Sequence, residues 1–279
     1  MGPTIKPDQF LIIVGCRKGG TTSLFEYLSE HPAVCPSVLK EPGYFKTYSN
    51  ARRHAPNVVR YEDLWPDFDL AVHSYALEGS PGYTRPDQNG VAERMRAYGI
   101  QPRLIYLVRD PVERIESDVN YQRIMSRRPA SFNDPLFLDI SRYATRIAPF
   151  VETFGRANIR VVTFDRLRTE PNQVCAELYD WLGLEPYTIA DPAIWNETAS
   201  IKQPQAQRMM EGRRISRILP SVVKKPIKRA VLKLFPSPYQ PQRVRLSPER
   251  TREIRKLLQG DMARLAVEWG VDVSPWGFE

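Results

Sequence analysis

A glycine-rich loop between an apolar run and a helix constrains the fold of this chain more than any other feature. Residues 10–14 are all apolar, which indicates a strand buried on both faces. Gly15-Cys-Arg-Lys-Gly-Gly20 follows, and residues 21–30 then have apolar side chains at helical spacing. A strand, a glycine loop and a helix in this order predict an α/β fold in which free amide groups at the helix start surround an anion.

Further apolar runs predict the rest of the sheet. Residues 103–109 and 159–164 read as buried strands, and residues 76–78 as a shorter one. Helices are expected from Pro111 to about Met125, and through residues 174–181 to a stop at Gly183. This alternation predicts a central parallel sheet flanked by helices, with ligands beyond the carboxyl ends of the strands. Residues 44–73 have no clear period and are expected to form a loop or irregular helices over the site.

A last helix is expected after Ser247, which can cap it, with Pro248 in its first turn and an end at Gly270. We expect its apolar residues to form one face that packs on the core. These residues are Ile254, Leu257, Leu258, Met262, Leu265 and Trp269.

The loop departs from the nucleotide-triphosphate pattern G-x-x-x-x-G-K-[ST]. Gly15 and Gly20 match its glycines, but Thr21 stands where that pattern has lysine, and the lysine lies inside the loop as Lys18. No apolar strand ends in a clear magnesium-binding aspartate. A P-loop kinase or other nucleotide triphosphatase is therefore the less favoured alternative.

Three motifs resemble the start of a sulfotransferase that uses 3′-phosphoadenosine 5′-phosphosulfate (PAPS). They are Lys18-Gly-Gly-Thr-Thr-Ser-Leu24, His31-Pro32 and Lys40-Glu-Pro-Gly-Tyr-Phe45. The subgroup they resemble contains heparan sulfate-type carbohydrate enzymes and bacterial relatives. The resemblance implies a P-loop-like sulfotransferase fold, the desulfonated nucleotide PAP as product and no metal. It places the 5′-phosphosulfate against Arg17, Lys18, Gly19, Gly20, Thr21, Thr22 and Ser23.

A second element resembles the site that this family uses for the 3′-phosphate. Tyr106-Leu-Val-Arg109-Asp-Pro-Val-Glu-Arg114-Ile-Glu-Ser117 puts an arginine at a strand end and a serine two helical turns later. The guanidinium of Arg109 could bind two phosphate oxygens at once. Arg109 and Ser117 are therefore expected to hold the nucleotide, whereas Arg114 could join them or pair with a neighbouring acid.

The resemblance also implies catalytic residues. Lys18 would stabilise charge on the leaving phosphate, and Lys40 would lie near the transferring group. Glu41, in its K-E-P-x-x-F context, would accept the proton of the acceptor hydroxyl. Because Glu78-Gly-Ser80-Pro-Gly-Tyr83 resembles the segment that lines the acceptor cleft, Glu41, Ser80 and Tyr83 are expected to bind the acceptor.

One alternative to the assignment of the base stays open, and one segment departs from the family pattern. Small-molecule sulfotransferases use a histidine base, for which this chain offers His31, His54 and His73, although His31 in its His-Pro element is expected to be structural. The family's third nucleotide segment often carries a basic residue beside glycine. Here residues 195–200 read Trp-Asn-Glu-Thr-Ala-Ser, with Lys202 nearby.

The basic charge is concentrated late in the chain. The formal net charge is +8, and residues 202–256 hold 16 lysines and arginines against 3 acidic residues. Within them, residues 218–235 alternate apolar and basic side chains at helical spacing. Such a helix could lie on an anionic membrane, bind an acidic acceptor, close over PAPS or pack on the domain. Peripheral membrane contact is thus one option, and no nucleic-acid partner is expected.

Other features limit the class of protein. The apolar run at residues 10–14 is far shorter than the roughly 20 residues of a membrane span. The start of the chain lacks a signal-peptide pattern, and the three cysteines have neither disulfide nor zinc spacing. We expect a cytoplasmic single domain over residues 1–279, comprising a nucleotide-binding core (10–200), a basic segment (201–246) and a C-terminal helix on the core (247–279).

These observations predict a PAPS-dependent sulfotransferase that moves a sulfuryl group to an acceptor hydroxyl. A carbohydrate, a glycolipid or another alcohol could supply that hydroxyl. Besides the nucleotide triphosphatase, the alternative is a non-enzymatic basic module that binds a membrane or nucleic acid. Such a module would leave the glycine loop and Arg109 without a role.

Overall fold

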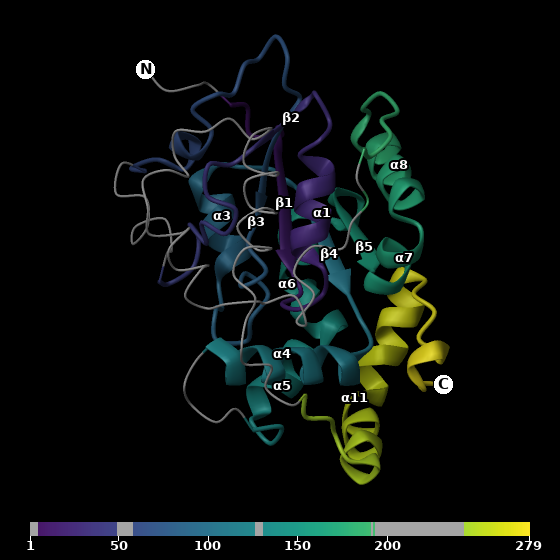
Figure 1. Ribbon diagram of the computed structural model, residues 1–279. Helices are drawn as coiled ribbons and strands as arrows, with labels where there is room; N and C mark the ends of the chain where they lie inside the picture. Colours follow the sequence, from purple (N-terminus) through teal and green to yellow (C-terminus); the bar gives the residue numbers. More distant parts are fainter. Residues whose placement is uncertain (1–4, 49–57, 126–130, 191, 193–242) are drawn as a thin grey trace.

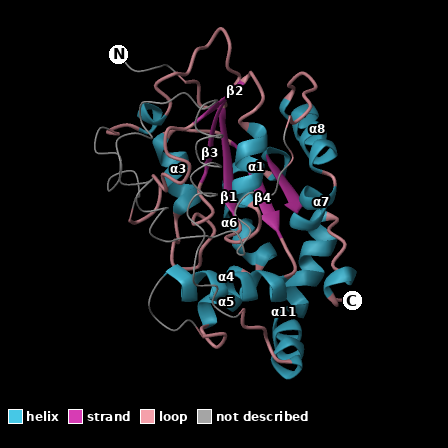
Figure 2. Cartoon of the chain, in the orientation of Figure 1, coloured by secondary structure: helices cyan, strands magenta, loops and turns pink. Residues whose placement is uncertain are grey.

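A sheet of five parallel strands forms the centre of the protein (Figures 1 and 2). The computed structural model describes residues 5–48, 58–125, 131–190, 192 and 243–279. In sheet order the strands are β2 (Val34–Pro36), β3 (Tyr75–Gly79), β1 (Phe10–Gly15), β4 (Arg103–Val108) and β5 (Ile159–Thr163). All four neighbouring pairs are parallel. The α/β fold and the four predicted strands are confirmed, whereas β2, a three-residue strand ending in proline, was not predicted.

Helices cover both faces of the sheet, and the pleat of β1 explains why. The helices are α1 (Thr21–Leu28), α3 (Val91–Tyr98), α4 (Pro111–Met125), α5 (Pro135–Ile140), α6 (Tyr143–Phe154), α7 (Phe164–Thr169), α8 (Pro171–Leu182) and α11 (Pro248–Trp269). Leu11 and Ile13 point into one apolar cluster with α1, α7 and α8, whereas Phe10, Ile12 and Val14 point into another with α3, α4, α6 and α11. Three short 3-10 turns are η1 (Tyr61–Leu64), η2 (Arg156–Asn158) and η5 (Ser274–Trp276).

The topology brings the predicted motifs to one edge of the sheet. β1 lies between β3 and β4. The chain adds β2 and β3 on one side of β1 and then β4 and β5 on the other side, so the strand order switches direction at β1. Figure 1 shows α4 below the carboxyl ends of the strands, where the loop after β1 and the turn after β4 also lie. Open α/β sheets bind ligands at such a switch in strand order. α4 begins at Pro111 as expected, and the Asp110 carboxylate before it accepts the amide protons of Val112 and Glu113 at 2.7 and 3.3 Å.

The C-terminal helix α11 packs against α6 and α4. Its predicted cap is present, since the Ser247 hydroxyl accepts the Arg250 amide at 3.2 Å. Ile254, Leu258, Met262 and Leu265 are buried as expected. The prediction for Leu257 was wrong: it is 44% exposed, because it lies just beyond the edge of the buried stripe, which is centred on Ile254, Leu258 and Leu265.

Two other details differ from the prediction. The single helix expected after β5 is broken into α7 and α8 at Glu170-Pro171, because proline supplies no amide donor and disfavours a helical residue before it. The described part of residues 44–73 contains only the short helix η1.

His54 and residues 195–202 and 218–235 lie outside the described residues, and the three-part division of the chain stays a prediction. Among the residues that the structure describes, no helix combines the length and apolarity that a membrane span requires.

Candidate active site at the ends of β1 and β4

The glycine loop is held in a shape that requires its glycines. The Cys16 amide donates to Leu107 O on β4 at 2.7 Å, and the Gly19 amide donates back to Cys16 O at 3.0 Å. Gly20 caps α1 with a φ of 95°, in the left-handed region. A Cβ atom there would lie 2.6 Å from the Phe164 ring. Any side chain at this position would therefore be strained and would also collide.

Lys18 provides a partly desolvated cation beside this loop. Its Nζ lies 4.4 Å from the centroid of the Tyr121 ring on α4. Burial lowers the pKa of Lys18 to about 8, with Asp118 and Glu41 acting in the opposite direction and the cations Arg17 and Arg109 adding to the fall. Arg109 and Glu41 are thus both close enough to Lys18 to affect its charge. Residues from three separate motifs meet at one place.

Arg17 and Arg114 share one buried carboxylate. Arg17 Nε lies 2.8 Å from Asp118 Oδ1, and Arg114 Nη1 lies 3.1 Å from Asp118 Oδ2. The side chains of Arg114 and Asp118 are fully buried. Arg114 also donates to Ser141 Oγ and Phe137 O. Arg114 thus pairs with a neighbouring acid, which is the second of the two roles expected for it, and Arg17 forms an ion pair with the same acid.

Arg109 lies where the loop meets the start of α7. Its guanidinium carbon is 4.4 Å from the centroid of Phe164, the ring that Gly20 faces. Its Nε and Nη2 both donate to Glu113 Oε2, at 3.2 and 2.7 Å. Phe164 therefore contacts both predicted nucleotide motifs. Ser117, two turns further along α4, is half-buried.

The Lys40–Glu41 turn reaches the first turn of α1. Lys40 Nζ donates to Thr22 Oγ1 at 2.8 Å and lies 3.0 Å from Glu41 Oε1. The Glu41 side chain is 49% exposed, so its carboxylate is accessible from solvent. Thr21 and Ser23, the other hydroxyl residues of this region, are buried.

Ser80 and Tyr83 lie beneath this turn. They are only 2% and 1% exposed. The Gly43 amide donates to Ser80 Oγ at 2.9 Å, and the Phe45 amide donates to Tyr83 Oη at 3.4 Å. The structure gives both hydroxyls a supporting place under the turn, and their contact with an acceptor stays a prediction.

The described histidines serve local structure. His31 is buried, with Nε2 3.0 Å from Glu185 O and Nδ1 accepting the Ala33 amide at 3.1 Å, as expected for a structural residue. His73 Nδ1 accepts the Asp69 amide at 2.9 Å. Across the part of the chain that the structure describes, no group of three histidine, cysteine or acidic residues could hold a metal ion.

Sequence reasoning missed Tyr121 and Phe164. Tyr121 carried a signal, because it follows Ser117 by four residues and so lies on the same face of α4. Phe164 carried none, since it reads as the last residue of an apolar strand.

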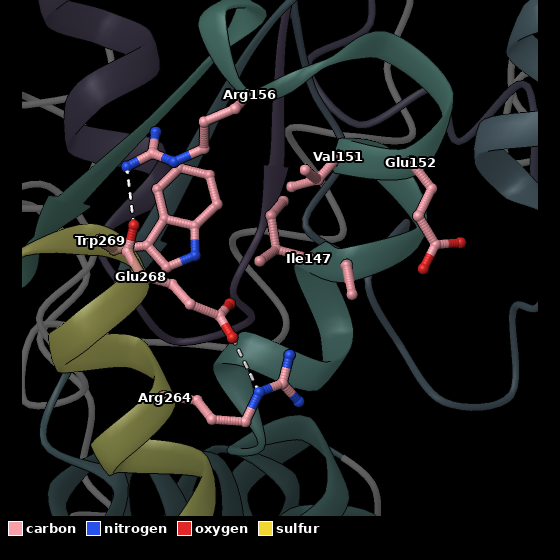
Figure 3. Close-up of a pocket in the computed structure, with 8 residues that line it drawn as sticks. Ile147, Val151, Glu152, Arg156, Arg264, Glu268 and Trp269 are labelled. Carbon is pink, nitrogen blue, oxygen red and sulfur yellow. Dashed lines mark hydrogen bonds and ion pairs between the residues drawn. The ribbon is translucent and has the colours of Figure 1, made fainter.

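A cavity of about 380 Å³ lies elsewhere, between α6 and α11 (Figure 3). Arg156 covers the Trp269 ring there at 3.4 Å, and Arg264 pairs with Glu268 at 2.9 Å. Arg156 begins η2, the turn directly before β5, so this cavity is at the amino end of that strand, whereas the glycine loop follows the carboxyl end of β1. None of the predicted site residues lines it.

Comparison with known proteins points to one family. The Sulfotransferase domain family matches residues 8–217. Heparan sulfate glucosamine 3-O-sulfotransferase 3B1 of Mus musculus is 29% identical over 203 residues, 67% of this chain and 49% of that protein. Heparan sulfate glucosamine 3-O-sulfotransferase 6 of Homo sapiens is 28% identical over 200 residues, 66% of this chain and 55% of that protein. The chain thus spans about half the length of the curated relatives it matches.

A solved structure shows the same fold over nearly the whole chain. The crystal structure of a sulfotransferase from Alicyclobacillus acidocaldarius superposes with a TM-score of 0.67 and 20% identity. The match covers 98% of this chain and 99% of that one.

Proposed function

Since the chain belongs to the Sulfotransferase domain family, we propose that it transfers a sulfuryl group from PAPS to an acceptor hydroxyl, giving PAP and a sulfate ester. The observation that carries this proposal is the meeting of Lys18 and Arg109 at one sheet edge. Lys18 lies in the loop after β1, Arg109 follows the neighbouring strand β4, and Arg109 adds to burial in lowering the pKa of Lys18. A doubly phosphorylated adenosine presents anions at both ends and fits two such cationic positions.

The glycine loop suits the 5′-phosphosulfate. The amide groups in the first turn of α1, with the partial positive charge of the helix, favour an anion there. Lys18 supplies a full charge from inside the loop, and Thr22 a hydroxyl. In-line transfer of such a group is catalysed mainly by positioning and by stabilising charge on the leaving oxygens. We assign that stabilisation to Lys18.

Arg109 suits the 3′-phosphate. Its guanidinium already binds a carboxylate, that of Glu113, through two nitrogens. Both nitrogens now donate to one oxygen, Glu113 Oε2, whereas a phosphate offers each of them its own oxygen and carries more charge, so it can replace Glu113. Stacking on Phe164 keeps the guanidinium plane fixed for this exchange. We place Ser117 beside it as a further nucleotide contact.

Glu41 is our candidate base. It is exposed to solvent, it is close to Lys18, and it shares Lys40 with Thr22. It could therefore take the proton of a hydroxyl that approaches from solvent toward the transferring group. The heparan sulfate enzymes among the relatives favour a carbohydrate acceptor, with a glycolipid or another alcohol as the further options.

Binding and transfer test this proposal together. Calorimetric titration should show PAP binding, and radiolabelled PAPS should transfer label to at least one member of a panel of desulfated heparan, glycolipid and simple alcohol acceptors. Lys18→Ala should abolish turnover at saturating PAPS, whereas Arg109→Ala should mainly weaken PAP binding. ATP hydrolysis without PAP binding would instead support a nucleotide triphosphatase.

A further inference from the structure

Glu78 is a buried carboxyl group that the proposed reaction does not use. It lies near the end of β3, is 0% exposed, and faces the hydroxyls of Ser80 and Tyr83. Its Oε2 accepts the Ser80 hydroxyl at 3.4 Å, while its Oε1 has no hydrogen-bond partner among the described residues. Because an isolated buried carboxylate is costly, its place beside the site needs an explanation other than stability.

Glu78 lies under both hydroxyls that support the turn carrying Glu41. Ser80 Oγ accepts the Gly43 amide, and Tyr83 Oη accepts the Phe45 amide. A hydroxyl has one proton, so each of these groups can accept from an amide and still donate to a carboxylate. The Ser80 hydroxyl therefore joins the turn to Glu78 by a hydrogen bond, and burial together with the nearby Glu78 carboxyl raises the pKa of Tyr83.

The backbone next to Glu78 holds the other side of the turn. The Gly79 amide donates to Lys40 O at 3.1 Å. Glu41 and Pro42 thus lie between Lys40, fixed by Gly79, and Gly43, fixed by Ser80. The Ser80–Glu78 contact, at 3.4 Å, is longer than the 2.5–3.0 Å usual for a hydroxyl donor, so it is the weakest hydrogen bond in this chain of contacts.

We propose that Glu78 is a positioning residue for the candidate base: acting through Ser80 and Tyr83, its carboxylate sets the place of the turn that carries Glu41. This inference rests on the proposed function, because it takes Glu41 as the base. An ionised Glu78 draws both hydroxyls inward and holds the turn, whereas a protonated Glu78 is a weaker acceptor and releases it.

The surroundings of Glu78 make this device sensitive near neutral pH. Burial raises the pKa of Glu78 to about 7, against the opposing effect of the Tyr83, Tyr61 and Ser80 hydroxyls and the Lys46 amine. Tyr61 faces it from η1, Ser80 and Tyr83 from the segment after β3, and Lys46 from beyond the turn. Burial lowers the pKa of Lys46, and both Glu41 and Glu78 oppose that fall, so this cation is influenced by the two carboxylates.

The first test reads the turn without any turnover. In the full-length protein with PAP, amide hydrogen exchange at Gly43 and Phe45 should be at least tenfold faster in Glu78→Gln than in the parent. Ser80→Ala should accelerate Gly43 alone. Asp261→Asn is the matched control, because Asp261 is also a buried carboxylate that accepts two amides, those of Ala144 and Thr145. It should accelerate exchange on α6 and leave Gly43 and Phe45 unchanged.

The second test reads the reaction. Glu78→Gln should lower kcat about tenfold above pH 7 and remove the step in kcat near pH 7, with PAP affinity unchanged, and Ser80→Ala should reproduce the loss of kcat. Unchanged exchange at Gly43 and Phe45 in both variants would overturn the inference. Absence of transfer by the parent to every acceptor would defeat the proposed function, while the exchange data would still decide the role of Glu78.

Discussion

Lys40 donates a hydrogen bond from Nζ to the hydroxyl of Thr22, 2.8 Å away and 18 residues earlier in the chain. The same amine pairs with Glu41 at 3.0 Å. One cation therefore joins the first turn of α1, where we place the phosphosulfate, to the carboxylate that we place at the acceptor.

This link predicts that Lys40 and Thr22 act as a unit. Lys40→Met and Thr22→Val should each lower kcat, and the double variant should lose less than the product of the two effects. A coupling of about 1 kcal/mol, or roughly fivefold in kcat, is expected for residues in contact. Lys40→Met combined with Thr153→Val, on α6, should be additive. Full additivity of the Lys40 and Thr22 variants would mean that the contact has no part in turnover.

PAP affinity should depend on pH through Lys18. Because burial lowers its pKa to about 8, Lys18 is charged below that pH and neutral above it. Affinity should therefore fall as the pH rises through 8, and binding at pH 8 should take up a proton, since the phosphate stabilises the ammonium. Calorimetry in buffers of different ionisation enthalpy measures that proton. Lys18→Met should lack both effects, while Lys6→Met, at an exposed position, should keep them.

Two glycines with nearly the same φ angle allow the cost of backbone strain to be measured apart from the cost of steric overlap. Gly20 and Gly99 have φ angles of 95° and 97°, but a Cβ atom meets the Phe164 ring at Gly20 and open space at Gly99. Gly99→Ala should cost about 1 kcal/mol of unfolding free energy from backbone strain alone. Gly20→Ala should cost about 1–3 kcal/mol more from overpacking and should also weaken PAP binding. Equal losses in urea denaturation would show that Phe164 does not constrain the loop.

Buried and exposed ion pairs with the same spacing should behave differently. Arg114–Asp118 and Arg264–Glu268 are both four residues apart, but only the first is fully buried. Asp118→Asn leaves two arginines without their partner and should cost about 3–5 kcal/mol. Glu268→Gln should change the unfolding free energy by about 0.5 kcal/mol or less. A small loss at Asp118 would imply that water or another group compensates the buried arginines.

Local sequence patterns predicted most of the strands and the motifs that form the candidate site. The apolar runs of β1, β4 and β5 identify buried strands because a parallel sheet with both faces covered leaves no polar face. The three-residue strand β2 is too short to be recognised in this way, and the helices α3, α5 and α6 were not predicted. The glycine loop, Arg109 and the Lys40–Glu41 turn were found as motifs, since each lies within a few residues of sequence.

By itself, the sequence determined which groups are available: a loop that needs glycine, a lysine within it, an arginine at a strand end and an acid before a proline. Only the tertiary structure decided which of them meet. Arg17 reaches Asp118 across 101 residues, and Phe164 lies between Gly20 and Arg109 because β4 separates β1 from β5 in the sheet. Such contacts follow from strand order and crossover, which bring distant residues together without leaving any periodic pattern in the chain.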